Sequence, residues 1–132
     1  KIKTMKFHHI GIACKDIEVT KIFLQKSFEI KNITDTLYDE KQDVNLCMLT
    51  TSDNLNIELV SGITVKPFIK KSQFLYHNCW SVKNIDISIK LLVSNGATLI
   101  SEPKEAILFN NNKVAFLFSD IGIVELLEEK ND

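Results

Sequence analysis

Two histidines and two glutamates in this sequence carry side chains that could share a metal ion, and they occur at a repeated spacing. His77 follows His9 by 68 positions, and Glu125 follows Glu58 by 67 positions. Two imidazoles and two carboxylates suit a divalent ion such as Zn, Ni, Co, Fe or Mn, and four protein ligands leave one or two positions for water or substrate. Taken alone, a histidine in a strand is more often a hydrogen-bonded structural residue than a ligand, and a glutamate in a strand usually faces solvent, so the combination of the four residues carries the argument.

The spacing comes from an internal repeat. The stretch FHHIGIACKDI (residues 7–17) is echoed by LYHNCWSVKNI (residues 75–85), and LNIELV (residues 55–60) is echoed by GIVELL (residues 122–127). Self-similarity at a fixed period indicates one supersecondary unit that is used twice. The two histidines and the two glutamates therefore occupy equivalent points of the two copies.

The first copy begins with an alternating strand, residues 7–14. Alternation puts His9 on a face with small residues, opposite Ile10 and Ile12, so His9 is expected to face a cavity. Asp16 is a candidate N-cap, and the helix after it has an expected apolar stripe at Ile17, Val19, Ile22 and Phe23.

Three strands are predicted between residues 30 and 60. They cover residues 34–38, the weakest of the three, then 44–49 and 55–60. In the last strand Ile57 and Leu59 share one face, so Glu58 points to the other. A solvent-facing connector, residues 62–74, then carries Lys66, Lys70 and Lys71, with room for one helical turn.

The second copy repeats this order. His77 shares a strand face with Cys79 and Ser81, while Asn78 falls on the core side without an evident reason. The next helix has apolar residues at helical spacing and ends at Asn95-Gly96. Strands are predicted at residues 98–101, 114–118 and 121–127.

Each copy is therefore predicted to be a βαβββ unit. The predicted fold class is α+β, with two tandem βαβββ modules (about 6–61 and 75–129) in a single domain, residues 1–132. The modules are expected to form a cup-shaped mixed sheet with the helices on its outer face. His9, Glu58, His77 and Glu125 would all point into that cup.

Composition limits the classes of function. The 132 residues are 45% hydrophobic and 25% charged, with a formal charge of −1, which argues against a nucleic-acid partner. No apolar run approaches membrane-spanning length and no secretory leader is evident. Cys14, Cys47 and Cys79 are too few and too scattered for a disulfide framework. A cytoplasmic location is expected.

The quoted stretches, together with KVAFLFSDIGIVELLEE (residues 113–129), resemble the vicinal oxygen chelate superfamily, which includes glyoxalase I, methylmalonyl-CoA epimerase, extradiol dioxygenases and drug-resistance proteins. The resemblance covers about residues 7–129. It is closest to the methylmalonyl-CoA epimerase-like and clostridial glyoxalase-like proteins. It implies a divalent metal ion as cofactor, with the ligands His9, Glu58, His77 and Glu125.

The resemblance also implies an activity. Relatives of this kind are lyases or isomerases that abstract a proton next to a carbonyl or thioester while the metal holds the enediolate oxygens. Glu125 is the expected catalytic base and Glu58 the other candidate. The expected substrate is a small thioester or thiohemiacetal, and the expected assembly is a homodimer.

Several departures from the family leave the substrate open. The alignment puts Asn45 where epimerases of several bacteria carry a second acid–base glutamate, and the arginine that helps many glyoxalases bind glutathione has no counterpart. The lysines of the connector are either a solvated basic turn or a contact for an anionic handle, and the second interpretation favours a coenzyme A thioester.

Two other functions are compatible with the same fold. One is a non-catalytic small-molecule binding protein of the drug-sequestering kind, whose members generally lack the four ligands. The other is a dioxygenase, which expects two histidines and one carboxylate around iron. The complete set of four residues favours the lyase or isomerase.

Overall fold

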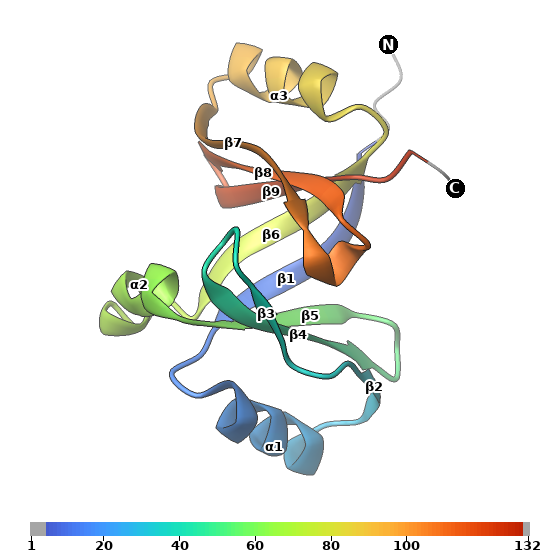
Figure 1. Ribbon diagram of the computed structural model, residues 1–132, viewed down its shortest axis with the longest axis vertical. Coiled ribbons are helices and arrows are strands. Elements are labelled where there is room, and N and C mark those ends of the chain that lie inside the picture. The colour runs from blue at the N-terminus through green and yellow to red at the C-terminus, as the bar shows by residue number, and fades with distance from the viewer. Residues whose placement is uncertain (1–4, 131–132) are drawn as a thin grey trace. The chain divides into compact units, whose positions relative to one another are not determined.

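The computed structural model describes residues 5–130. By its contacts the chain divides into two compact units. One comprises His9–Tyr76, and the other combines the chain up to His8 with the residues from His77 onward. Figure 1 labels the elements of both units.

The unit formed by His9–Tyr76 holds most of the first module. Its helix is α1 (Ile17–Ser27), and its strands are β1 (Lys6–Ala13, whose first three residues fall outside the unit), β2 (Ile30–Ile33), β3 (Leu37–Asp39), β4 (Val44–Thr51) and β5 (Asn56–Ser61). Strand β1 runs parallel to β5, and β4 is antiparallel to β5, β2 and β3. This is the βαβββ order with one additional short strand.

The additional strand corrects the prediction of a single strand at residues 34–38. The main chain of Thr34 donates to the Met48 carbonyl, but the returning bond from Met48 N–H, 2.9 Å, goes to the Thr34 hydroxyl oxygen. A side chain therefore takes the place of a ladder carbonyl, which interrupts the pairing with β4. The chain resumes pairing only at Leu37, which lies opposite Leu46.

Helix α1 begins at the predicted cap. The Asp16 carboxylate accepts from the backbone N–H groups of Glu18 (3.0 Å) and Val19 (3.4 Å), which have no partner inside the helix. The predicted apolar stripe is right at Ile17, which is buried, and wrong at Val19, Ile22 and Phe23, which are 62%, 52% and 60% exposed. The helix buries Ile17 and Leu24, which are seven positions apart and lie on one face.

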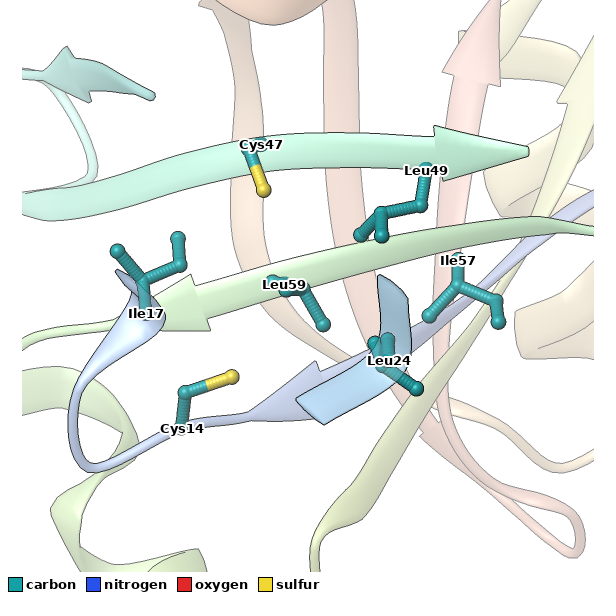
Figure 2. Close-up of a cluster of buried hydrophobic side chains, with 7 residues drawn as sticks. All are labelled: Cys14, Ile17, Leu24, Cys47, Leu49, Ile57 and Leu59. Carbon is teal, nitrogen blue, oxygen red and sulfur yellow. The ribbon is translucent and has the colours of Figure 1, made fainter. Parts of the chain in front are cut away.

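The core of this unit lies between α1 and the strands below it. Figure 2 shows its buried side chains converging from the helix, the end of β1, β4 and β5. They are Cys14, Ile17, Leu24, Cys47, Leu49, Ile57 and Leu59. Ile10 and Ile12 of β1 pack against the same cluster, as their alternation predicted. The opposite face of β1 is therefore the one that carries His9.

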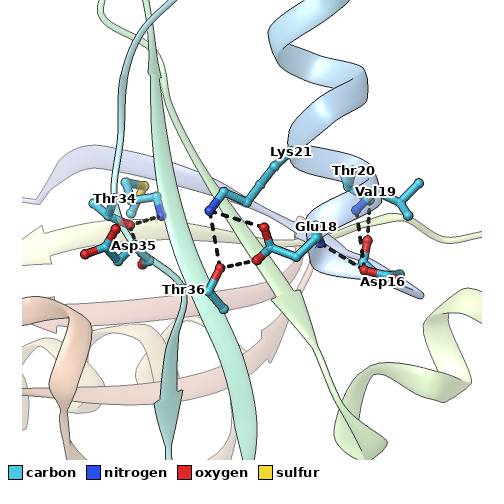
Figure 3. A network of polar contacts seen from close by, with 9 residues as sticks. Asp16, Glu18, Val19, Thr20, Lys21, Thr34, Asp35 and Thr36 are labelled. Carbon is cyan, nitrogen blue, oxygen red and sulfur yellow. Dashed lines mark hydrogen bonds and ion pairs between the residues drawn. The ribbon is translucent and has the colours of Figure 1, made fainter.

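A polar network on the surface ties α1 to the segment between β2 and β3 (Figure 3). The Thr36 hydroxyl donates to the Glu18 carboxylate at 2.7 Å, and the Lys21 ammonium donates to the Thr36 hydroxyl at 3.3 Å. Lys21 also lies 3.7 Å from the Glu18 carboxylate. These contacts hold the interrupted strand region against the helix.

The second unit contains most of the second module. Its helix is α3 (Ile85–Ser94), and its strands are β6 (Leu75–Val82), β7 (Thr98–Ala106), β8 (Asn112–Ser119) and β9 (Gly122–Glu128), with a 3-10 turn η2 (Ile107–Phe109) before β8. Strand β6 is parallel to β9, which is antiparallel to β8, and β8 is antiparallel to β7. Helix α3 begins with Asn84 as N-cap and packs Ile85, Ile89 and Leu92 on the core, as predicted.

Asn78 has a structural role that its sequence position did not suggest. Its side-chain NH₂ donates to the carbonyls of Ile121 (3.2 Å) and Ile123 (3.4 Å), at the start of β9. Its side-chain oxygen accepts from the Trp80 indole N–H at 2.7 Å. The polar atoms of this amide therefore all have hydrogen-bond partners on the core side of β6. Its bonds to β9 are additional to the backbone hydrogen bonds that pair the two strands.

The connector forms a 3-10 turn, η1 (Ile63–Val65), and a one-turn helix, α2 (Lys66–Lys70), with Pro67 in its first turn. Helix α2 has no buried residue, as expected of a solvent-facing connector, but η1 buries Val65. The predicted α+β class and the tandem βαβββ modules are confirmed. Among residues 5–130, no helix is both long enough and apolar enough to cross a membrane.

Candidate metal centre

The first histidine–glutamate pair comes from the parallel strands β1 and β5. His9 is fully buried and Glu58 is 3% exposed. Glu58 lies opposite Gly11 in the parallel ladder. Gly11 is two residues after His9 and therefore on the same face of β1, so the carboxylate and the imidazole are on one side of the sheet. The His9 Nε2 and Glu58 Oε1 atoms are 3.2 Å apart.

The second pair repeats this arrangement with β6 and β9. Cys79, two residues after His77, lies opposite Glu125 in another parallel ladder. The His77 Nε2 and Glu125 Oε1 atoms are 3.1 Å apart, and both residues are buried. The two modules therefore repeat more than the sequence. They also share the strand register, the contact between histidine Nε2 and glutamate Oε1, and the burial of both side chains.

Each pair has the spacing of two neighbouring metal ligands. Nitrogen and oxygen ligands lie about 2.0–2.2 Å from a divalent ion, so two adjacent ligands at 90–110° are about 3.0–3.4 Å apart. The observed separations of 3.1 and 3.2 Å fall in this interval. Imidazole and carboxylate are also ligand types that borderline divalent metals accept. The residues of each pair therefore fit an ion.

The surroundings of the His77–Glu125 pair are apolar. Phe116 lies directly opposite Glu125 on β8, and its ring meets the His77 ring edge-on, with centroids 5.7 Å apart. Phe116 packs with Phe109 against a buried cluster made of Cys79, Ala106, Val114 and Leu127. An apolar wall of this kind keeps water from the carboxylate and strengthens its interaction with charge.

Phe116 was not among the residues singled out from the sequence. Residues 114–118 are apolar at every position, so the sequence indicates a strand but not which of its two faces Phe116 belongs to functionally. Its place beside Glu125 depends on the register between β8 and β9, which the spacing of residues does not reveal.

The His9–Glu58 pair has a different neighbour. Met48 of β4 lies opposite Glu58 and shares its face. Asn45 has the same strand parity as Cys47 and Leu49, so it lies on the other face of β4. The position expected for a second acid–base residue therefore does not face Glu58.

The lysines of the connector are exposed on or beside α2. Lys66 and Lys70 delimit the helix, and Lys71 follows it. Their contact with an anionic substrate stays a prediction.

Comparison with solved structures identifies proteins of the same fold. A hypothetical protein from Bacillus halodurans C-125 is 26% identical, with 98% of each chain covered and a TM-score of 0.80. Methylmalonyl-CoA epimerase from Mycobacterium tuberculosis is 18% identical, with 92% of this chain and 86% of that chain covered and a TM-score of 0.78. Glyoxalase I from Zea mays is 16% identical, with 97% and 44% covered and a TM-score of 0.64.

A search of curated proteins found no match to the sequence. A family model does match, over residues 8–116, which include three of the four candidate ligands, His9, Glu58 and His77. The match spans most of the chain and agrees with the fold of the solved neighbours. The protein belongs to the Glyoxalase/Bleomycin resistance protein/Dioxygenase superfamily.

Proposed function

We propose that this protein is a divalent-metal-dependent lyase or isomerase of the glyoxalase and epimerase kind. It moves a proton on a carbon next to a carbonyl or thioester group of a small molecule. The observation that carries the proposal is the buried histidine–glutamate pair that occurs twice in the same strand register. A structural pair would have no reason to keep both the residue types and the register in each module.

The ion is held by His9, Glu58, His77 and Glu125 together. Support for one shared site comes from the repeat, because residues at equivalent points of duplicated modules serve one function in this superfamily. Each pair alone supplies two ligands, which is fewer than the three or four of an ordinary protein metal site. When bound, the ion supplies Lewis acidity toward the substrate carbonyl oxygen.

Glu125 is the proposed base and acts through its carboxylate. It takes the proton from the substrate carbon and returns it to the neighbouring carbon. Return to the opposite face of the same carbon would need a second acid on that face, for which Glu58 is the other candidate. Phe116 excludes water on one side of this carboxylate, so that the proton is exchanged with the substrate rather than with solvent. A metal binds the neutral form of imidazole, so this is the form in which His9 and His77 would act as ligands.

The first test is metal content with matched histidine variants. Protein purified without a histidine tag and titrated with Zn, Ni, Co, Fe or Mn is expected to bind one ion per chain. His9→Ala and His77→Ala should each weaken binding by at least about tenfold, the lower scale for a lost interaction at a metal site. His8→Gln is the control, because His8 is the one histidine of the three in the chain that is not a proposed ligand.

The second test is proton exchange in deuterated water. Thioesters of coenzyme A and thiohemiacetals of glutathione are incubated with the metal-loaded protein, and deuterium next to the carbonyl is followed by NMR. Metal-dependent exchange is expected with one of the two classes. Stoichiometric metal binding without exchange in either class would favour a non-catalytic binding protein, and the absence of metal binding would overturn the proposal.

A further inference from the structure

A cavity lies on the helix side of the second unit, away from the proposed metal ligands. It has a volume of about 480 Å³ and opens between the end of α3 and the turn that joins β8 to β9. Trp80 and Val124 form part of its lining, and each alternates along its strand with His77 or Glu125. The cavity therefore belongs to the opposite face of β6 and β9, and the proposed reaction does not use it.

The size and lining of this cavity are those of a small-molecule site. Ligand pockets usually measure about 300–1,000 Å³ and are mainly apolar. Here the apolar lining consists of Met5, Trp80, Leu91, Leu92, Ala97, Ile121 and Val124. Gly96 also lines the cavity, and a Cβ atom placed there would meet nothing within 4 Å. The space beside Gly96 is therefore open to a ligand.

The polar groups at the rim are negative or neutral. Asp120 is exposed, and among residues 5–130 its carboxylate makes no hydrogen bond or ion pair. Asn95 and Gly96 follow the last turn of α3, where the helix dipole places partial negative charge. Among residues 5–130, no lysine or arginine lines the cavity. The charge distribution therefore favours a cation.

Trp80 adds to this preference. Its indole N–H is already bound to Asn78, so it offers a ligand its apolar ring. Tryptophan rings attract ammonium groups more strongly than other aromatic side chains do. An apolar floor, an aromatic ring and an uncommitted carboxylate together suit an amine with a hydrophobic body.

We propose that this cavity binds a small organic amine, with one or two rings in the apolar part and the ammonium group directed toward Asp120. The site is separate from the proposed metal centre in its residues, its face of the sheet and the chemistry of its ligand.

The chain contains a single tryptophan, so its fluorescence reports on this cavity directly. The probes are phenethylamine, 2-phenylethanol and 3-phenylpropanoate, which are similar in size and differ in charge. A saturable change in Trp80 fluorescence is expected, with affinity in the order amine, alcohol, carboxylate. The result should be the same in the presence of EDTA, because the cavity contains none of the proposed metal ligands.

Two variants sharpen the test. Asp120→Asn should weaken amine binding about two- to fivefold, the range for a partly exposed ion pair, and leave alcohol binding unchanged. Asp35→Asn is the matched control, because Asp35 is an exposed carboxylate of the other unit. Ala97→Leu, which fills the cavity, should weaken the binding of both compounds.

The proposal is overturned if no probe gives a saturable change. It is also overturned if the carboxylate binds as tightly as the amine, or if Asp120→Asn and Asp35→Asn have the same effect. These outcomes do not depend on metal binding or on catalysis.

Discussion

Glu58 and Glu125 are equivalent by repeat, yet their cross-strand neighbours differ. Glu58 lies opposite the flexible thioether Met48, whereas Glu125 lies opposite the ring of Phe116. Both glutamates are almost fully buried, so the difference lies in the neighbour: a rigid aromatic ring restricts the position of the Glu125 carboxylate more than a flexible thioether restricts that of Glu58. The local environment thus supports Glu125 as the base and Glu58 as mainly a ligand.

Substitution by glutamine tests this division. Glu125→Gln should keep the fold and lose turnover by at least about a hundredfold, the scale of a missing general base. Glu58→Gln should cost less, because an amide oxygen still reaches an ion. Steady-state kinetics of the metal-loaded variants, with metal content measured in parallel, distinguishes the two. The reverse ranking would assign the base to Glu58.

Cys47 makes stability depend on pH at the alkaline end. Burial raises the pKa of its thiol from 9.0 to about 11, against the smaller opposing effect of Lys21. The folded protein therefore holds this proton more tightly than the unfolded chain does. The resulting stability is fully present below pH 9 and is lost as the pH rises through 11, by an amount on the order of 2–3 kcal/mol.

Urea unfolding at pH 8 and pH 11 measures this effect. The loss of unfolding free energy between the two pH values should be smaller in Cys47→Ala than in the unsubstituted protein. Both proteins also lose stability from other groups, so the comparison uses the difference between them. An equal loss in the two proteins would show that the thiol does not titrate with folding.

At the scale of single elements, Asn78 joins two strands that carry proposed ligands. Its amide bonds the start of β9 and accepts from Trp80, all within one unit. Asn78→Leu would remove both sets of bonds and leave the Trp80 N–H without its acceptor, which costs about 1–3 kcal/mol.

Chemical denaturation should show this loss. Asn78→Asp keeps the acceptor for Trp80 but turns a carboxylate oxygen toward the carbonyls of Ile121 and Ile123, so it should also destabilise the protein. Asn54→Asp is a control, since Asn54 is an exposed turn residue of the other unit. A neutral Asn78→Leu substitution would show that the amide contributes nothing to the pairing of β6 with β9.

For the whole molecule, the proposed ion links residues that are far apart in the sequence. Binding to the folded chain alone adds about 2.7 kcal/mol when the free ion is at a hundred times its Kd. Removal of the ion by a chelator should therefore lower the Tm by several degrees. His77→Ala should lose most of this shift and His8→Gln should keep it. Equal Tm values with and without chelator would contradict a shared site.

The homodimer also stays a prediction. Exposed Val19 and Phe23 on α1, with the ring of Phe28 edge-on to Phe23, form an apolar surface of the kind that oligomers cover. Light scattering at micromolar concentration should give twice the mass of the chain, 15.1 kDa. A monomeric mass would contradict the prediction.

Much of the fold and the identity of the candidate ligands could be inferred from residue order. The repeat, the Asp16 and Asn84 helix starts and the two faces of β1 all follow from local rules, because capping and strand alternation involve residues within a few positions of one another. The equivalence of His9 with His77 and of Glu58 with Glu125 follows from the repeat, since duplicated modules place equivalent residues alike. Which histidine meets which glutamate depends on the parallel register of β1 with β5 and of β6 with β9.

Other features depended on packing between distant segments. Val19 and Phe23 have the hydrophobicity of core residues, but the strands beneath α1 meet Ile17 and Leu24 instead. The role of Asn78 and the place of Phe116 beside Glu125 arise from the register of β9 with its two neighbours. The register of β8 with β9 is set locally by the short turn between them, but the contact of the Phe116 ring with His77 also needs β6 in place. The register of β6 with β9 is an agreement between strands tens of residues apart, and a one-residue shift would turn each side chain to the other face. Local sequence patterns carry no information about that agreement, so it emerges only when the sheet is assembled.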